Sequence, residues 1–145
     1  MLVQLLYISD HDGTIIPDIG NFMIDMRERN TEAHLSSILL STDKNYIHLI
    51  EGSRIAVNGL YNKISKDVKH CNCTILRYID IRTREFSQWK AEHVSMSSFR
   101  VDNINLLSSI DVHSDSITSA QAVTMIRRIH AHLLVRSENT NKPPI

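Results

Sequence analysis

Residues 46–52 read Tyr-Ile-His-Leu-Ile-Glu-Gly, a short apolar run that closes on a glutamate and a glycine. The run follows residues 42–44, Thr-Asp-Lys, a polar triplet typical of a turn. A second apolar run, residues 35–41, comes directly before the triplet. Two runs of this length joined by a short polar stretch predict a β-hairpin, and the rest of the chain is placed around it.

The segments on either side of the hairpin alternate between strand and helix patterns. Strand-like runs, short and rich in apolar or β-branched residues, occupy residues 1–9, 74–81 and 85–89. Helical spacing of apolar residues begins at Pro17, and again behind Ser53, a residue suited to cap a helix. The resulting order β-α-β-β-α-β-β predicts an α+β fold of the ferredoxin-like, split βαβ type.

The C-terminal third is expected to cover the second face of the sheet. Residues 101–110 predict a short apolar helix, and residues 118–121, Thr-Ser-Ala-Gln, fit a capping box that starts a helix reaching about Arg136. The sequence therefore predicts a core with two C-terminal helices. We divide it into a domain over residues 1–95, a helical extension over 96–136 and a flexible tail over 137–145.

Composition limits the functional classes. The 145 residues carry 16 Lys and Arg against 16 Asp and Glu, so the net charge is zero and the basic excess of a nucleic-acid binder is missing. No apolar stretch approaches the roughly 18 residues of a membrane span. Cys71 and Cys73 stand too close for a comfortable bridge within a strand. We expect a cytoplasmic protein with reduced thiols, no nucleic-acid or membrane partner and a tendency to self-associate.

Further motifs stand at fixed distances from the hairpin. They share aromatic, amide or charged residues beside apolar positions: Tyr7-Ile8-Ser9, Asn30, Leu60-Tyr61-Asn62-Lys63-Ile64, Asp67-Val68-Lys69-His70 and Arg84-Glu85-Phe86-Ser87-Gln88-Trp89. In this order and spacing the chain resembles the BLUF family, blue-light sensors that hold a flavin between two helices. The resemblance covers roughly residues 2–91.

The resemblance implies FAD as cofactor, with FMN or riboflavin as alternatives. It implies Tyr7 as electron donor and Trp89 as a mobile aromatic, so that Tyr7, His48 and Trp89 are the photoactive set. The implied flavin contacts are Ser9, Ile24, Asn30, His48, Lys63, Ile64, Asp67 and His70. Short stand-alone members of the family form homo-oligomers and bind a partner protein, which implies an output through an unidentified downstream protein.

Five positions depart from the family pattern. The photoactive glutamine is His48 here; Ser36-Ser37 replaces Thr-Gly, Lys63 an arginine and Ala91 a methionine. The first change is the severe one. A glutamine amide can exchange its donor and acceptor between tyrosine and flavin, whereas an imidazole holds its donor and acceptor in a rigid ring. We therefore expect an altered or lost photocycle.

Other interpretations remain open at this stage. Each residue alone has an ordinary structural role: Tyr7 and His48 as satisfied core residues, Asn30 as a helix-end residue, and Lys63 with Asp67 as a solvated pair. The alternative function is a flavin-free interaction module with the same fold. A metal- or redox-sensing role for Cys71 and Cys73 is weaker, because no ligand-pair spacing of cysteines and histidines supports a metal. No phosphate-binding loop or nucleophile motif occurs, so no enzymatic activity or catalytic residue is expected.

Overall fold

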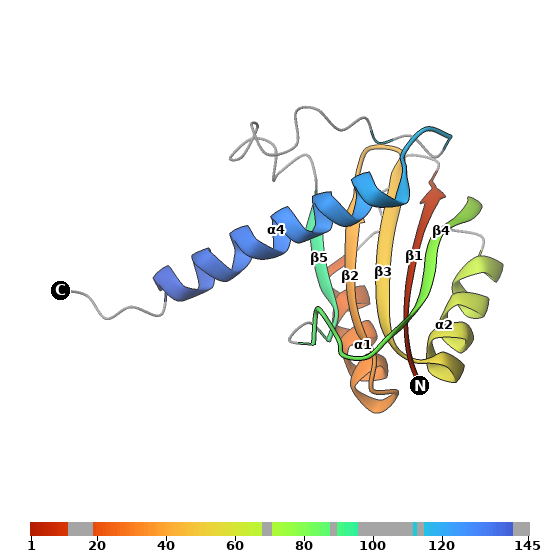
Figure 1. Ribbon diagram of the computed structural model, residues 1–145, viewed down its shortest axis with the longest axis horizontal. Helices are drawn as coiled ribbons and strands as arrows, with labels where there is room; N and C mark the ends of the chain where they lie inside the picture. The colour runs from red at the N-terminus through yellow and green to blue at the C-terminus, as the bar shows by residue number, and fades with distance from the viewer. Residues whose placement is uncertain (12–18, 68–70, 88–89, 96–111, 113–114, 141–145) are drawn as a thin grey trace.

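The computed structural model of the 145-residue chain describes residues 1–11, 19–67, 71–87, 90–95, 112 and 115–140. One sheet lies between two helical layers (Figure 1). Helices α1 (Ile19–Glu32) and α2 (Arg54–Lys66) cover one face, and helix α4 (Ser119–Thr140) crosses the other. The α+β, ferredoxin-like fold expected from the element order is confirmed.

The sheet has five strands in the order β4-β1-β3-β2-β5. Their bounds are β1 Leu2–Asp10, β2 Ser36–Ser41, β3 Asn45–Ser53, β4 Cys71–Ile81 and β5 Glu92–Ser95. Strand β3 pairs antiparallel with both β1 and β2, β4 pairs antiparallel with β1, and β5 runs parallel to β2. The predicted hairpin is β2–β3, and β3 is the central strand.

Local chemistry sets the ends of the hairpin and of two helices. In the turn between β2 and β3, Thr42 Oγ1 accepts a hydrogen bond from Asn45 N at 2.9 Å. Ser53 caps α2 by accepting from Ala56 N at 3.2 Å. The predicted capping box of α4 is present: Thr118 Oγ1 accepts from Gln121 N at 3.0 Å, and Gln121 Oε1 accepts from Thr118 N at 2.9 Å. These predictions from the sequence are confirmed.

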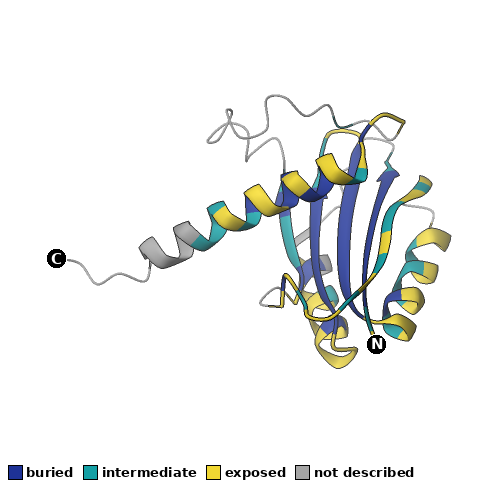
Figure 2. Ribbon diagram, in the orientation of Figure 1, coloured by how far each residue is buried: buried dark blue, intermediate teal, exposed yellow. Residues whose placement is uncertain are grey.

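Alternate residues of β1 point to opposite faces of the sheet. Leu5 and Tyr7 pack with Val57 of α2, on the side that we call the pocket face. Leu6 and Ile8 pack among the apolar residues of α4, on the side that we call the α4 face. Figure 2 shows β1, β2 and β3 buried between the helical layers. Helix α2 and the part of α4 that lies over the sheet turn exposed residues outward.

Helix α4 supplies the predicted cover. Its stripe of Ala122, Met125, Ile126 and Ile129 is buried against the sheet, and Leu133 packs at the end of the same cluster. The helix continues to Thr140, four residues beyond the end expected from the sequence. The short helix predicted over residues 101–110 lies outside the described residues.

One predicted strand is wrong. Residues 85–87, expected to begin the fifth strand, are irregular, and β5 lies at Glu92–Ser95. The physical reason is the buried carboxylate of Glu51, which accepts hydrogen bonds from the backbone N–H groups of Glu85 and Phe86 at 3.1 and 2.8 Å. These two donors are satisfied by a side chain, so they do not join a ladder of strand hydrogen bonds.

No helix in the described part of the chain is long and apolar enough to cross a membrane.

Candidate functional site

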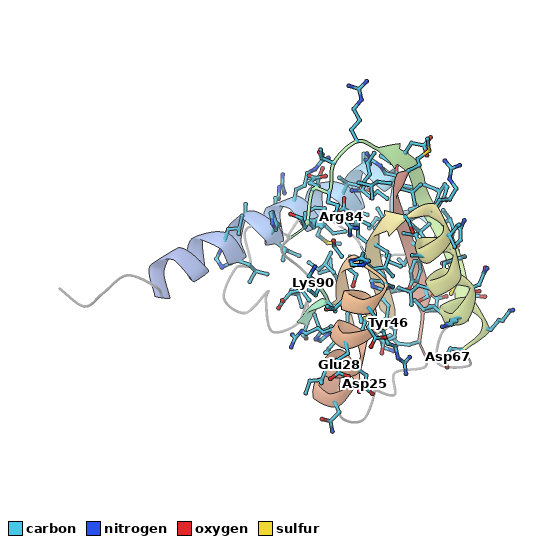
Figure 3. The ribbon with its side chains drawn as sticks, turned by 90° about the horizontal axis from the view of Figure 1, so that it is seen from below. Asp25, Glu28, Tyr46, Asp67, Arg84 and Lys90 are labelled. Carbon is cyan, nitrogen blue, oxygen red and sulfur yellow. The ribbon has the colours of Figure 1, made fainter. Side chains whose placement is uncertain are left out.

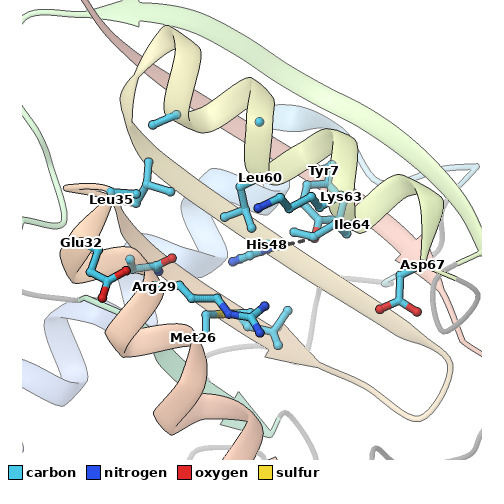
Figure 4. A pocket seen from close by; sticks show the side chains of 15 residues that line it. Tyr7, Met26, Arg29, Glu32, Leu35, His48, Leu60, Lys63, Ile64 and Asp67 are labelled. Atoms are coloured by element: carbon cyan, nitrogen blue, oxygen red, sulfur yellow. Dashed lines mark hydrogen bonds between the residues drawn. The ribbon is translucent and has the colours of Figure 1, made fainter.

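A cavity of about 560 Å³ opens on the pocket face, between α1 and α2 (Figure 4). Its floor is the sheet, where Tyr7 of β1, Leu39 of β2 and His48 of β3 contribute side chains. This volume lies within the range of about 300–1,000 Å³ that is usual for small-molecule sites.

Tyr7 and His48 form the polar centre of the floor. They are directly paired across β1 and β3, and the Tyr7 hydroxyl lies 2.8 Å from His48 Nδ1. Both side chains are buried, and Figure 4 shows the hydrogen bond beneath α2. Tyr7 also lies at a bulge in the β1–β4 ladder, which is a common feature beside functional sites.

The surroundings of Tyr7 keep its phenol neutral. Burial, with smaller contributions from Cys73 and Tyr61, raises the pKa of the Tyr7 phenol well above its usual value. The Tyr61 ring meets the Tyr7 ring edge-on, with centroids 5.3 Å apart. Tyr7 therefore carries its proton at physiological pH and shares a hydrogen bond with the imidazole.

Asn30 lies at the C-terminal end of α1 and lines the cavity, with 1% of its surface exposed. Its Nδ2 donates to Ser37 Oγ of β2 at 2.8 Å and to the backbone oxygen of Lys90 at 2.5 Å. The neighbouring carbonyl, Ala91 O, accepts from Arg27 Nε at 2.9 Å. Two α1 side chains thus fix the segment that leads into β5.

Helix α2 forms the opposite wall of the cavity. The lining residues recur at helical spacing along one face: Ala56, Gly59, Leu60, Lys63 and Ile64, with Asp67 at the C-cap. A Cβ placed on Gly59 would meet no heavy atom within 4 Å, so the wall is open at this position. Glycine inside a helix costs about 1 kcal/mol relative to alanine, and here it leaves room for a flat group to approach the helix.

The chain matches the model of a known protein family. Residues 2–92 match the family model of BLUF, described as sensors of blue-light using FAD. The chain belongs to the BLUF family. The family's cofactor is therefore FAD, and the cavity lies between two helices and a sheet, where the resemblance placed a flavin.

Solved structures share the BLUF fold. BlrB, a BLUF protein in its dark state, is 26% identical with a TM-score of 0.74, over 90% of this chain and 96% of that one. BlsA in its ground state is 20% identical with a TM-score of 0.73, over 88% and 86% of the two chains. A bacterial light-regulated adenylyl cyclase is 23% identical with a TM-score of 0.66, over 91% of this chain and 36% of the cyclase. The curated proteins include no match.

The cavity brings together six of the predicted residues. Tyr7, Asn30, His48, Lys63, Ile64 and Asp67 all line the cavity. Ser9 is buried but does not line it, and Ile24 is 50% exposed and does not line it either. His70 and Trp89 lie outside the described residues.

Sequence reasoning missed part of the lining. Met26, Arg29 and Leu39 reach the cavity, and Met26 takes the place on α1 that the sequence analysis gave to Ile24. A signal was available, because Met26 stands four residues before Asn30 and therefore on the same helical face. Gly59 was also missed; its place between Ala56 and Lys63 on the predicted helix was the available sign.

The residues present fit a flavin. The ring is flat and apolar on its faces and polar along one edge, and the cavity offers Leu60 and Ile64 beside Lys63 and the amide of Asn30. Among the described residues, no group of three metal-ligating side chains could hold a metal ion. Cys73 forms no disulfide with a described residue.

Proposed function

We propose that this BLUF chain binds FAD between α1 and α2 and acts as a blue-light sensory protein with an altered response. The observation that carries the proposal is the Tyr7–His48 hydrogen bond of 2.8 Å in the floor of the cavity. It puts an imidazole nitrogen in direct contact with the phenol, at the position where the family has an amide, and in the tautomer protonated at Nε2 this nitrogen accepts the phenolic hydrogen.

In this proposal the flavin, once excited by blue light, supplies an electron acceptor. Tyr7 gives up an electron, and its phenolic proton moves across the short hydrogen bond to His48 Nδ1. The imidazole then holds the proton as a cation. Rotation of the imidazole ring does not bring a second nitrogen or oxygen into the place of Nδ1. The ring therefore does not reproduce the exchange of donor and acceptor that an amide makes.

Lys63 and Asp67 are assigned supporting roles. Both lie on the cavity side of α2, four residues apart. Lys63 can meet a carbonyl oxygen or a phosphate of the cofactor, and Asp67 can accept from a ring N–H or orient a neighbouring group. Lysine is a point charge without the planar fork of arginine, so this contact is less directional than that of the family's arginine.

Output is proposed to pass through protein contacts, without enzymatic activity of this chain. A net charge of zero gives little repulsion between copies of the chain and so favours homo-oligomers. A downstream protein in the cytoplasm would then receive the signal. The light-regulated adenylyl cyclase is organised differently, because its chain is more than twice as long as the part that this chain matches.

Reconstitution tests the cofactor. Purified protein is refolded or incubated with excess FAD, freed of unbound cofactor and examined for the blue absorption band of bound flavin. An absorption band that corresponds to one bound flavin per chain supports the proposal. Riboflavin and FMN, tested in the same way, show how much the adenylate of FAD contributes to binding. Protein that stays colourless with all three flavins would instead favour a flavin-free interaction module.

A further inference from the structure

We infer that Ser37 withholds one amide hydrogen of Asn30 from the cavity and thereby sets the affinity of the cavity for flavin. The inference rests on the proposed function, because it concerns how a flavin is recognised in this cavity. Ser37 stands where the family has glycine. Ser37 itself does not line the cavity, so its effect on the ligand passes through Asn30.

The first step is the hydrogen-bond count at Asn30. A side-chain amide has two N–H donors and one carbonyl acceptor. Nδ2 is engaged twice, by Ser37 Oγ at 2.8 Å and by Lys90 O at 2.5 Å. The Lys90 carbonyl can only accept, so the atom that faces it must be the nitrogen, and the orientation of the amide is fixed. Among the described residues, Oδ1 is then the only polar atom of this amide left for a ligand.

The second step is what a flavin edge requires. The edge presents the N3–H donor beside the O4 carbonyl acceptor. An unengaged amide can satisfy both, with its oxygen on N3–H and its nitrogen on O4. Asn30 in its present arrangement can satisfy only N3–H. The O4 carbonyl therefore competes with Ser37 and Lys90 for a donor, and each bond gained by the ligand is offset by one lost inside the protein.

The third step distinguishes the two competing acceptors. Lys90 O belongs to the segment leading into β5, where Arg27 Nε also holds the next carbonyl, Ala91 O, at 2.9 Å. Loss of the hydrogen bond from Asn30 to Lys90 O would loosen the chain before β5 (Lys90 is labelled in Figure 3). Ser37 Oγ belongs to a side chain on a strand held by β3, where Ser37 pairs with Ile50. Removing this oxygen frees one N–H of Asn30 and leaves the backbone in place.

The test is flavin affinity in Ser37→Ala, measured by fluorescence quenching of riboflavin and of FAD. Ser36→Ala is the matched control, because Ser36 is also buried in β2 but its Oγ accepts from Arg84 on the α4 face at 2.8 Å. Ser37→Ala should bind both flavins roughly fivefold more tightly, the effect of one hydrogen bond of typical net strength. Ser36→Ala should bind as wild type does. Unchanged or weaker binding in a folded Ser37→Ala protein overturns the inference and leaves the proposed function intact.

A measurement without flavin distinguishes failure of the inference about Ser37 from failure of the proposed function. In the ligand-free protein, the side-chain N–H groups of Asn30 should exchange slowly with solvent, and Ser37→Ala should speed one of them at least several-fold. NMR of the Asn30 side chain measures this directly. If neither protein binds flavin, the proposed function fails, and the exchange rates still decide about Ser37. Equal, fast exchange of both Asn30 hydrogens in the wild type overturns the inference.

Discussion

The pocket face and the α4 face of the sheet are built from the same strands, yet their polar residues do different things. On the α4 face, the buried carboxylate of Glu51 accepts hydrogen bonds from Gln4 Nε2 and from two backbone N–H groups, beside a cluster of buried apolar side chains. On the pocket face, Tyr7, Asn30 and His48 line a cavity. Buried polar groups that only pair with one another stabilise a fold, whereas buried polar groups around a void indicate a ligand.

Neighbouring serines show the same contrast at the scale of one residue. Ser36 accepts from Arg84, which also donates to the backbone oxygens of His34 and Glu51 and so fastens the connection after β4 (Figure 3). Ser37 accepts from Asn30 in the cavity wall. The comparison predicts that damage to the α4 face costs stability with little effect on the cavity, and that damage to the pocket face does the reverse.

The largest effect is expected from removing residues 116–145. This deletion takes away Ile117 and the α4 stripe and exposes the apolar residues Leu6, Ile8 and Ile38 of the sheet. A continuous apolar face of this kind promotes aggregation. The shortened protein should lose solubility or change its oligomeric state in sedimentation velocity. A soluble product that sediments like the full chain, apart from its lower mass, would contradict this role of α4.

The next effect is that of Glu51→Ala. Glu51 is fully buried, and the change leaves the amide of Gln4 and the backbone donors of Glu85 and Phe86 without their acceptor. Each unsatisfied buried donor costs about 1–3 kcal/mol, so urea unfolding should show a loss of roughly 3 kcal/mol or more. Flavin affinity of the folded fraction should stay near that of the wild type. A loss below about 1 kcal/mol would show that the network contributes little.

Filling the cavity at Gly59 should have the opposite effect to Glu51→Ala: flavin binding is lost and stability is kept. Gly59→Leu places a side chain in open space and removes a helix-interior glycine, so stability should hold or rise by up to about 1 kcal/mol. Flavin binding should disappear, because the side chain occupies the α2 wall. Asn58→Leu is the control, since position 58 is exposed on the same helix and does not line the cavity. Undiminished flavin affinity in a folded Gly59→Leu protein would place the ligand elsewhere.

The smallest effect concerns the ion pair between Arg127 and Glu85. Arg127 Nε lies 2.6 Å from Glu85 Oε1, and this hydrogen bond lowers the pKa of the Glu85 carboxyl below its usual value. A depressed carboxyl pKa stabilises the fold above the unfolded pKa and stops doing so as pH falls through the folded one. Both side chains are more than one-third exposed, so Arg127→Ala should cost only about 0.2–1 kcal/mol at neutral pH. Urea unfolding at pH near 7 and near 3 should show that the free energies of unfolding of wild type and Arg127→Ala differ less in acid. If the two proteins differ by the same amount at both pH values, Glu85 is not the source of the difference.

The sequence predicted much of the fold because several signals are local. The turn at residues 42–44, the cap at Ser53 and the capping box at residues 118–121 depend on neighbours in the chain. The fifth strand was misplaced because its position depends on Glu51, a residue 34 positions before Glu85. Local pattern carries no record of such a contact.

The same division applies to the site. Lys63, Ile64 and Asp67 were expected from the resemblance to the BLUF family, and helical spacing agrees by putting them on one side of α2. Ile24 was expected on the cavity side of α1, but the helix turns it outward and presents Met26. The engagement of Asn30 by Ser37 and Lys90 joins three separate elements, so no spacing rule could have predicted it.

The most direct test of the account is the light-minus-dark absorption spectrum of the FAD-loaded wild type, measured beside His48→Gln. We predict no reversible red shift in the wild type, only quenching or slow bleaching, because the imidazole that contacts Tyr7 cannot exchange donor and acceptor as an amide does. His48→Gln should gain the reversible shift, and His48→Gln with Tyr7→Phe should lose it again. A reversible red shift in the wild type would contradict the account at its centre.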